Sequence, residues 1–157
     1  MDELADVAGV SKATIYRWWP SKETLALDVL LTEWRTERPR STGSLRGDLL
    51  ALLRPWVRVV AKRPYGRMIA SLIAEAQCNP GFGRLWRERF VAVRREPGHL
   101  AFARAIQRGE IAADTDIELA LDLLYGPLYH RMLHGHAPLN DRVAVAVVDA
   151  ALHGVLA

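Results

Sequence analysis

Helical periodicity, interrupted by glycine, proline and N-capping residues, is the feature that most constrains this chain of 157 residues. Apolar residues recur three and four positions apart. No segment alternates apolar and polar residues over a useful length, and no Asn-Gly or Asp-Gly hairpin turn occurs. Because these are the signals of helices rather than strands, the sequence predicts an all-α fold.

The first forty residues predict three helices in close succession. Gly9 ends the first, since glycine is favoured where a chain leaves a helix with positive φ. Ser11 is a suitable N-cap for the second helix, which Pro20 stops, and Ser21 is a suitable N-cap for the third. The predicted helices cover residues 3–8, 12–19 and 22–37.

The segment from Pro39 to Gly43 is the best candidate for a domain boundary. It divides the chain into an N-terminal region, residues 1–38, and a helical C-terminal domain, residues 39–157. Pro55 is expected to kink or shift the first helix of that domain, and Pro97-Gly98 to break a later one. Asp114 or Asp116 caps the helix before the last. Helices are predicted over residues 45–62, 64–76, 81–96, 100–108, about 116–133, and 140 to the end.

The last two helices are unusually apolar, and the final one has almost no polar face, with valine or alanine at every position from 143 to 148. A helix that is apolar all round is buried. We therefore expect a homodimer that forms through these two helices. The alternative is that other helices of the same chain bury them.

Composition indicates a soluble, cytoplasmic protein. The one cysteine, Cys78, has no partner for an intrachain disulfide, and we expect it to be a small buried residue. There is no secretory signal and no apolar run long enough to cross a membrane. Residues 41–108 carry thirteen Lys or Arg against four Asp or Glu, whereas residues 109–157 carry two against seven. This asymmetry suits a molecule that turns one face towards a polyanion, although a solvated surface explains it about as well.

The N-terminal pattern of helix, glycine turn and capped helix is that of a helix-turn-helix, whose second helix enters the major groove of DNA. The outward side of residues 11–18 presents groups that donate hydrogen bonds to phosphates or base edges, namely Lys12, Thr14, Tyr16 and Arg17. Lys22 adds a charge at the start of the third helix. The sequence therefore predicts double-stranded DNA as a partner.

This motif resembles that of the TetR (tetracycline-repressor-like) family of bacterial regulators. The matching residues are Ala5, Ala8, Gly9, Val10, Ser11, Thr14, Tyr16, Lys22 and Leu25, with Trp19 where the family usually has Phe. The resemblance implies that Thr14, Tyr16 and Lys22 anchor phosphates, and that Lys12, Arg17 and Trp18 lie where base-reading or flanking contacts are made. Residues 124–133 resemble, more weakly, a dimerisation helix of some members. The implied function is a ligand-responsive repressor that acts as a homodimer on a palindromic operator.

Family members carry a further helix ahead of this motif. We therefore expect a coding sequence upstream of Met1, and without that helix we expect Leu4, Val7, Ile15 and Trp19 to be partly exposed. The alternative hypothesis is a dimeric ligand-binding module of the same fold that no longer binds DNA well.

Aromatic residues of the C-terminal domain are candidates for an apolar ligand pocket between helices, chiefly Trp56, Tyr125 and Tyr129, although such residues more often form core. His130 and His134, with the nearby His136, have a spacing that can hold a metal, but no carboxylate or thiol lies close in sequence. We expect these histidines at a dimer interface or a pocket rim. The sequence predicts no catalytic constellation, metal site or cofactor, and a helical enzyme that uses the histidines is a distant alternative.

Overall fold

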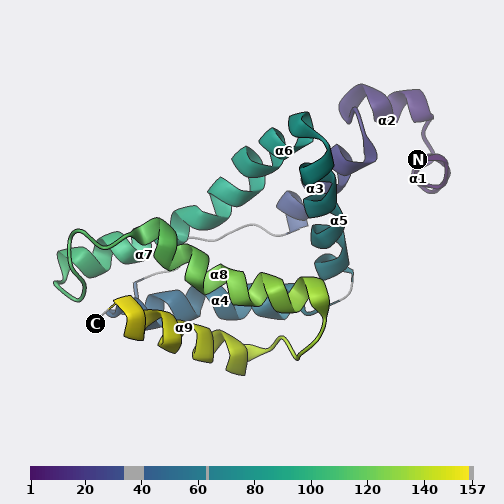
Figure 1. Cartoon of the computed structure of the whole chain (residues 1–157). Helices are drawn as coiled ribbons and strands as arrows, with labels where there is room; N and C mark the ends of the chain where they lie inside the picture. Colours follow the sequence, from purple (N-terminus) through teal and green to yellow (C-terminus); the bar gives the residue numbers. More distant parts are fainter. Residues whose placement is uncertain (34–40, 63, 156–157) are drawn as a thin grey trace.

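The computed structural model describes residues 1–33, 41–62 and 64–155, and every regular element in this part of the chain is helical (Figure 1). The all-α prediction is confirmed. The elements are α1 (Asp2–Ala8), α2 (Lys12–Trp18), α3 (Lys22–Glu33), α4 (Leu45–Val60), α5 (Tyr65–Cys78), α6 (Pro80–Trp86), the π-helical turn η1 (Arg87–Val91), α7 (Ala92–Gln107), α8 (Ile117–His134) and α9 (Asp141–Val155).

The helices form a body with a projecting head (Figure 1). Helices α1 and α2 make the head, which α3 joins to the body. In the body, α9 packs against both α4 and α8, and α4 also packs against α7. Helix α5 packs against α3, α4, α6 and α8. The head and the C-terminal end of the chain lie at opposite ends of the molecule.

One hydrophobic core joins α3 to the body of the protein. Leu27 and Leu30 of α3 are fully buried and belong to the same cluster as Phe90 and Phe102. Burying a leucine side chain stabilises a fold by roughly 1.5–3 kcal/mol. The head is therefore attached to the body through a helix whose inner face is part of the body's core.

The predicted break at Pro97-Gly98 is wrong, because α7 runs through both residues and buries them. A Cβ atom added to Gly98 would lie 2.5 Å from Cδ2 of Leu121 in α8. The two helices thus approach closely at this point, and tertiary packing holds a helix that local propensity alone would end. Pro55 also lies inside its helix, α4, without ending it.

Helix ends follow the predicted chemistry. Gly9 and Gly135, which end α1 and α8, have φ of 64° and 62°. Of the two candidates, Asp116 caps α8, since its Oδ1 accepts the backbone N–H of Leu119 at 3.0 Å. Asn140 accepts the first amides of α9. Residues 34–40 lie outside the described part, and with them the predicted end of the third helix and the boundary at residue 38.

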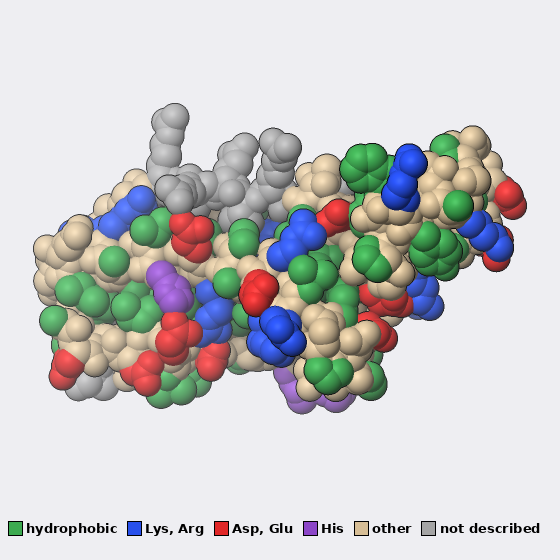
Figure 2. Space-filling model, turned by 90° about the horizontal axis from the view of Figure 1, so that it is seen from above, with side chains coloured by type: hydrophobic (Ala, Val, Ile, Leu, Met, Phe, Trp, Pro, Cys, Tyr) green, Lys and Arg blue, Asp and Glu red, His purple; other side chains and the backbone are tan. Residues whose placement is uncertain are grey.

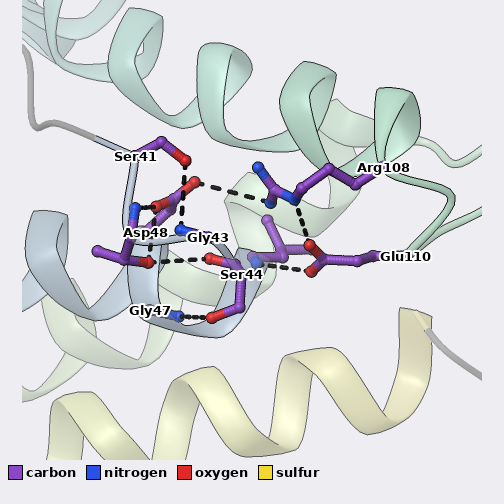
Figure 3. A network of polar contacts seen from close by, with 9 residues as sticks. Ser41, Gly43, Ser44, Gly47, Asp48, Arg108 and Glu110 are labelled. Atoms are coloured by element: carbon purple, nitrogen blue, oxygen red, sulfur yellow. Dashed lines mark hydrogen bonds and ion pairs between the residues drawn. The ribbon is translucent and has the colours of Figure 1, made fainter.

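A polar network holds the beginning of α4 (Figure 3). Asp48 is only 3 % exposed, and its Oδ1 accepts the backbone N–H of Thr42 at 2.6 Å and the Thr42 hydroxyl at 2.8 Å. Glu110, after α7, accepts the backbone N–H of Leu45 at 2.7 Å and pairs with Arg108. The Arg108 hydrogen bond is the main cause that lowers the pKa of Glu110. The network ties the first turn of α4 to the end of α7.

Candidate nucleic-acid interface and ligand cluster

Two short helices and a glycine turn build the head. Gly9 closes α1 in the left-handed conformation, and its N–H donates to the carbonyl of Asp6. Ser11 then caps α2 by accepting the backbone N–H of Thr14 at 3.1 Å, and the two hydroxyls lie 2.9 Å apart. The predicted helix–turn–capped-helix arrangement is confirmed. Thr14 is half-buried, because its hydroxyl belongs to this cap.

Helix α2 buries only Ile15, so the five predicted DNA-contacting side chains on this helix share its remaining surface. Tyr16 is 49 % and Trp18 70 % exposed, and Arg17 is exposed as well. Lys12 lies one turn before Tyr16 on the same strip of the helix. Its ammonium forms an ion pair with Asp2 of α1. Helix α2 therefore offers two aromatic side chains and one arginine, with one lysine already paired.

Lys22 begins α3, where its side chain is three-quarters exposed and 3.7 Å from the carboxylate of Glu23. Ser21 and Thr24 cap this helix reciprocally. The N–H of Thr24 donates to the Ser21 hydroxyl, and the N–H of Ser21 donates to the Thr24 hydroxyl, both at 3.2 Å. The sequence prediction of Ser21 as the cap is confirmed, and Lys22 is exposed in the first turn of α3, next to the head.

A carboxylate in α3 links the head to the body. The indole N–H of Trp19 donates to Oδ2 of Asp28 at 2.7 Å. Oδ1 of the same carboxylate lies 2.8 Å from the guanidinium of Arg89 in η1. Sequence reasoning missed both Asp28 and Arg89, since an acid in a helix and an arginine in a basic segment carry no distinguishing local pattern. These contacts join the end of α2 to η1 in the body.

Apolar side chains are exposed on α1 and on the turn that follows it. Leu4 is 46 %, Val7 84 % and Val10 42 % exposed. The expected exposure of Leu4 and Val7 is confirmed, and Trp19 is half-buried as expected. The expectation for Ile15 is wrong: it is 6 % exposed, because α1 and α2 pack against each other. Figure 2 shows hydrophobic side chains on the surface of the head beside basic and acidic ones.

The three aromatic residues predicted to bind a ligand do come together. The ring of Trp56 in α4 lies 6.1 Å from that of Tyr125 and 5.1 Å from that of Tyr129, both in α8. Burial raises the pKa of Tyr125 to about 12 and also raises that of Tyr129. Burial lowers the pKa of the neighbouring Arg94 to about 10. The cluster is thus a largely dry aromatic region with one cation beside it.

His130, His134 and His136 lie close together at the end of α8. The rings of His130 and His134 have centroids 4.6 Å apart, and His136 lies 4.9 Å from His130. Within the described residues, no group of three His, Cys, Asp or Glu side chains is arranged to hold a metal ion.

The prediction that Cys78 is buried is wrong. Cys78 is exposed, because it ends α5 at the surface.

Comparison with known proteins identifies the family. Residues 39–151 match the family described as "Tetracyclin repressor-like, C-terminal domain", and residues 1–29 match "Bacterial regulatory proteins, tetR family". The chain belongs to the TetR family of bacterial transcriptional regulators. The resemblance seen in the sequence is therefore confirmed, and the function of this TetR-family protein is DNA-binding transcriptional regulation.

Relatives of this TetR-family chain are similar over nearly its whole length. It is 34 % identical to the uncharacterized HTH-type transcriptional regulator YdeS of Bacillus subtilis, over 100 % of this chain and 79 % of that protein. It is 32 % identical to the DNA-binding transcriptional repressor TetR of Mycobacteroides abscessus, over 97 % of this chain and 80 % of that one. The crystal structure of the TetR-family regulator SCO0332 superposes with a TM-score of 0.80 at 37 % identity, over 98 % of this chain and 85 % of that one. Among the described helices, none has the length and apolar character needed to cross a membrane.

Proposed function

We propose that this TetR-family protein is a homodimeric repressor. It binds a palindromic operator in double-stranded DNA through α2 of each protomer, and a small apolar ligand changes that binding. It acts in the cytoplasm, beside the bacterial chromosome, and as a regulator rather than an enzyme. The observation that carries this proposal is the capped helix α2, which exposes Tyr16, Arg17 and Trp18 on a projecting head. A relative from Mycobacteroides abscessus is named a repressor, which supports repression rather than activation.

The DNA contact is assigned by side-chain chemistry. Arg17 and Lys12 supply charge-assisted donors to base edges or phosphates, and the hydroxyls of Thr14 and Tyr16 supply neutral ones. Lys22 reaches a phosphate from the start of α3. In this proposal the exposed part of α2 enters the major groove, and Lys22 at the start of α3 lies against the flanking backbone.

An exposed apolar face on α8 and α9 supports the homodimer. Leu119 and Leu123 are 56 % and 48 % exposed, four residues apart on one strip of α8. Ala146 and Ala150, also four apart, are exposed on α9. Because these leucines are already about half-buried, each one that a second copy covers contributes roughly 1 kcal/mol, about half of the value for complete burial. A two-fold dimer built on this face presents two heads, and two heads require a palindromic operator.

The aromatic cluster supports a ligand response. Trp56, Tyr125 and Tyr129 lie in edge-on and tilted contact with one another, and aromatic side chains of this kind commonly line apolar ligand sites. The cluster lies between α4 and α8, and α5, which packs on both, also packs on α3. A ligand that spreads these helices therefore biases the position of α3, and through it the head.

The test is a titration of the whole chain against duplex DNA from its own upstream region, over a range of salt concentrations. We expect sequence-dependent binding with a steep salt slope, which Tyr16→Ala and Lys22→Ala each weaken at least tenfold. Arg54→Gln, which removes an exposed cation far from the head, is the matched control and leaves binding unchanged.

One observation favours a second candidate. Asp2 pairs with Lys12, and the apolar side chains of Leu4 and Val7 are exposed beside α2. These features weaken a DNA-binding surface. A stable dimer that binds its own upstream DNA no better than a scrambled duplex would establish the alternative, a ligand-binding module of the same fold.

A further inference from the structure

A hollow lies at the end of the body where α4 ends, α5 begins and α8 ends. Its cavity volume is about 450 Å3, within the range of small-molecule sites. We call it the basic groove. The described residues that line it are Val60, Ala61, Lys62, Gly66, Arg67, Ala70, Arg131, Met132, Leu133, His134, Gly135, Ala137 and Leu139.

Every ionisable side chain among these described residues is basic: Lys62, Arg67, Arg131 and His134. Neither Lys62 nor Arg67 forms an ion pair with any residue that the structure describes, and both are exposed at the groove. Arg131 donates one hydrogen bond to the carbonyl of Pro138 at 2.8 Å, which holds its guanidinium beside the groove. The groove therefore concentrates positive charge without a carboxylate of its own.

The acidic residue that follows the groove's lining in the sequence already forms an ion pair elsewhere. Asp141 follows the loop that forms one wall, and its carboxylate is paired with Arg58 of α4. That pairing is also the main cause that lowers the pKa of Asp141. The positive charge of the groove is thus not neutralised from this neighbouring segment.

Close packing of the backbone shapes the groove. A Cβ atom added to Gly66 would lie 2.5 Å from the carbonyl oxygen of Val60, so only glycine allows α5 to begin this close to the end of α4. This approach brings the side chains of Lys62 and Arg67 to the same opening. The gathering of charge is therefore a consequence of a tight helix–helix turn.

Apolar residues complete the lining and lead towards the aromatic cluster. Val60 lies one helical turn after Trp56 on α4, and Met132 lies one turn after Tyr129 on α8. Both belong to the lining and border the core. A molecule bound in the groove can hold its charged group against the basic side chains and its apolar part against Val60 and Met132.

We propose that the basic groove binds a small organic anion, a carboxylate or a phosphate monoester with an apolar tail. Arginine matches both headgroups, since its planar guanidinium donates two parallel hydrogen bonds. This proposal rests on the ligand response proposed above and refines it: the ligand has an apolar tail but also an anionic headgroup, which binds outside the aromatic cluster.

The test uses four probes with the same eight-carbon tail, namely octanoate, octyl phosphate, octan-1-ol and octylamine. Binding to the full chain is measured by isothermal titration calorimetry. We expect both anions to bind at least tenfold more tightly than the alcohol, and the amine to bind most weakly. The tighter of the two anions identifies the headgroup.

Variants locate the binding. Arg67→Gln and Lys62→Gln each change an exposed side chain and are expected to leave the fold intact, which circular dichroism checks. Each is expected to weaken anion binding several-fold, and the double variant at least tenfold, while binding of the alcohol is unchanged. Arg84→Gln, an exposed arginine on α6 outside the groove, is the matched control and has no effect.

The proposal is overturned if neither anion binds more tightly than the alcohol, or if the double variant binds the anions as the unaltered chain does. DNA binding is titrated separately, without any probe. Anion binding by a chain that fails to bind DNA would leave the groove assigned and remove the repressor function. DNA binding without anion binding would support the repressor function and overturn the assignment of the groove.

Discussion

Asp28 of α3 and Arg89 of η1 lie 2.8 Å apart and form an ion pair between the helix that carries the head and the helices of the body. The other oxygen of Asp28 accepts the indole N–H of Trp19. One carboxylate thus contacts both Trp19, at the end of α2, and Arg89 of the body. The contact gives a physical route by which a shift in the body reaches the head.

We expect Asp28→Ala to lower the free energy of unfolding by about 1.5–3 kcal/mol, because it removes a charge-assisted hydrogen bond as well as the ion pair. Arg89→Gln removes only the ion pair, whose partners are 46 % and 36 % exposed, and is expected to cost less than about 1 kcal/mol. Urea unfolding measures both, with Thr32→Ala on the exposed side of α3 as the control. Equal losses for the two variants would show that the Trp19 bond contributes nothing.

Asp2→Asn is expected to raise affinity for DNA. Asp2 is paired with Lys12, which we propose contacts DNA, and an exposed pair of this kind is worth about 0.2–1 kcal/mol. Releasing Lys12 should therefore tighten binding by up to about fivefold at low salt. Glu3→Gln removes an exposed acid from the same helix and controls for the change in net charge. A gain of the same size in Glu3→Gln would rule out the specific pairing as the cause.

Asp48→Ala is expected to destabilise the fold by about 2–4 kcal/mol, since Asp48 is buried and accepts two hydrogen bonds from Thr42. Chemical denaturation followed by circular dichroism checks the value. Asp114→Ala, at an exposed position before α8, should stay within about 0.5 kcal/mol of the unaltered chain. A loss below about 1 kcal/mol for Asp48→Ala would mean that the network of Figure 3 does not hold the start of α4.

Stability is expected to fall in alkali through the aromatic cluster. A tyrosine in the unfolded chain ionises near pH 10, whereas burial raises the pKa of Tyr125 to about 12. The folded state keeps a proton that the unfolded state releases, so the free energy of unfolding decreases as the pH rises from about 10 to about 12. Tyr125→Phe should flatten this decline, and Tyr16→Phe, at an exposed tyrosine, should not. Thermal melts at successive pH values provide the measurement.

The sequence by itself determined the elements whose signals are local. The caps Ser11, Ser21 and Asp116 and the glycine at residue 9 each act within one turn of the chain, so the helix-turn-helix and most helix ends follow from neighbouring residues. Of the six residues predicted to face DNA, five lie on α2 and Lys22 lies at the start of α3, because their order along two successive helices sets their placement.

Only the tertiary structure decided what depends on residues far apart in the chain. Packing of Gly98 against Leu121 carries α7 through a proline that local propensity treats as a stop. The ion pair between Asp28 and Arg89 joins residues sixty-one positions apart. The basic groove likewise needs the end of α4 and the end of α8 to meet. No local pattern encodes such contacts, because they arise when separate helices bury their apolar faces in one core and bring polar side chains together at its edge.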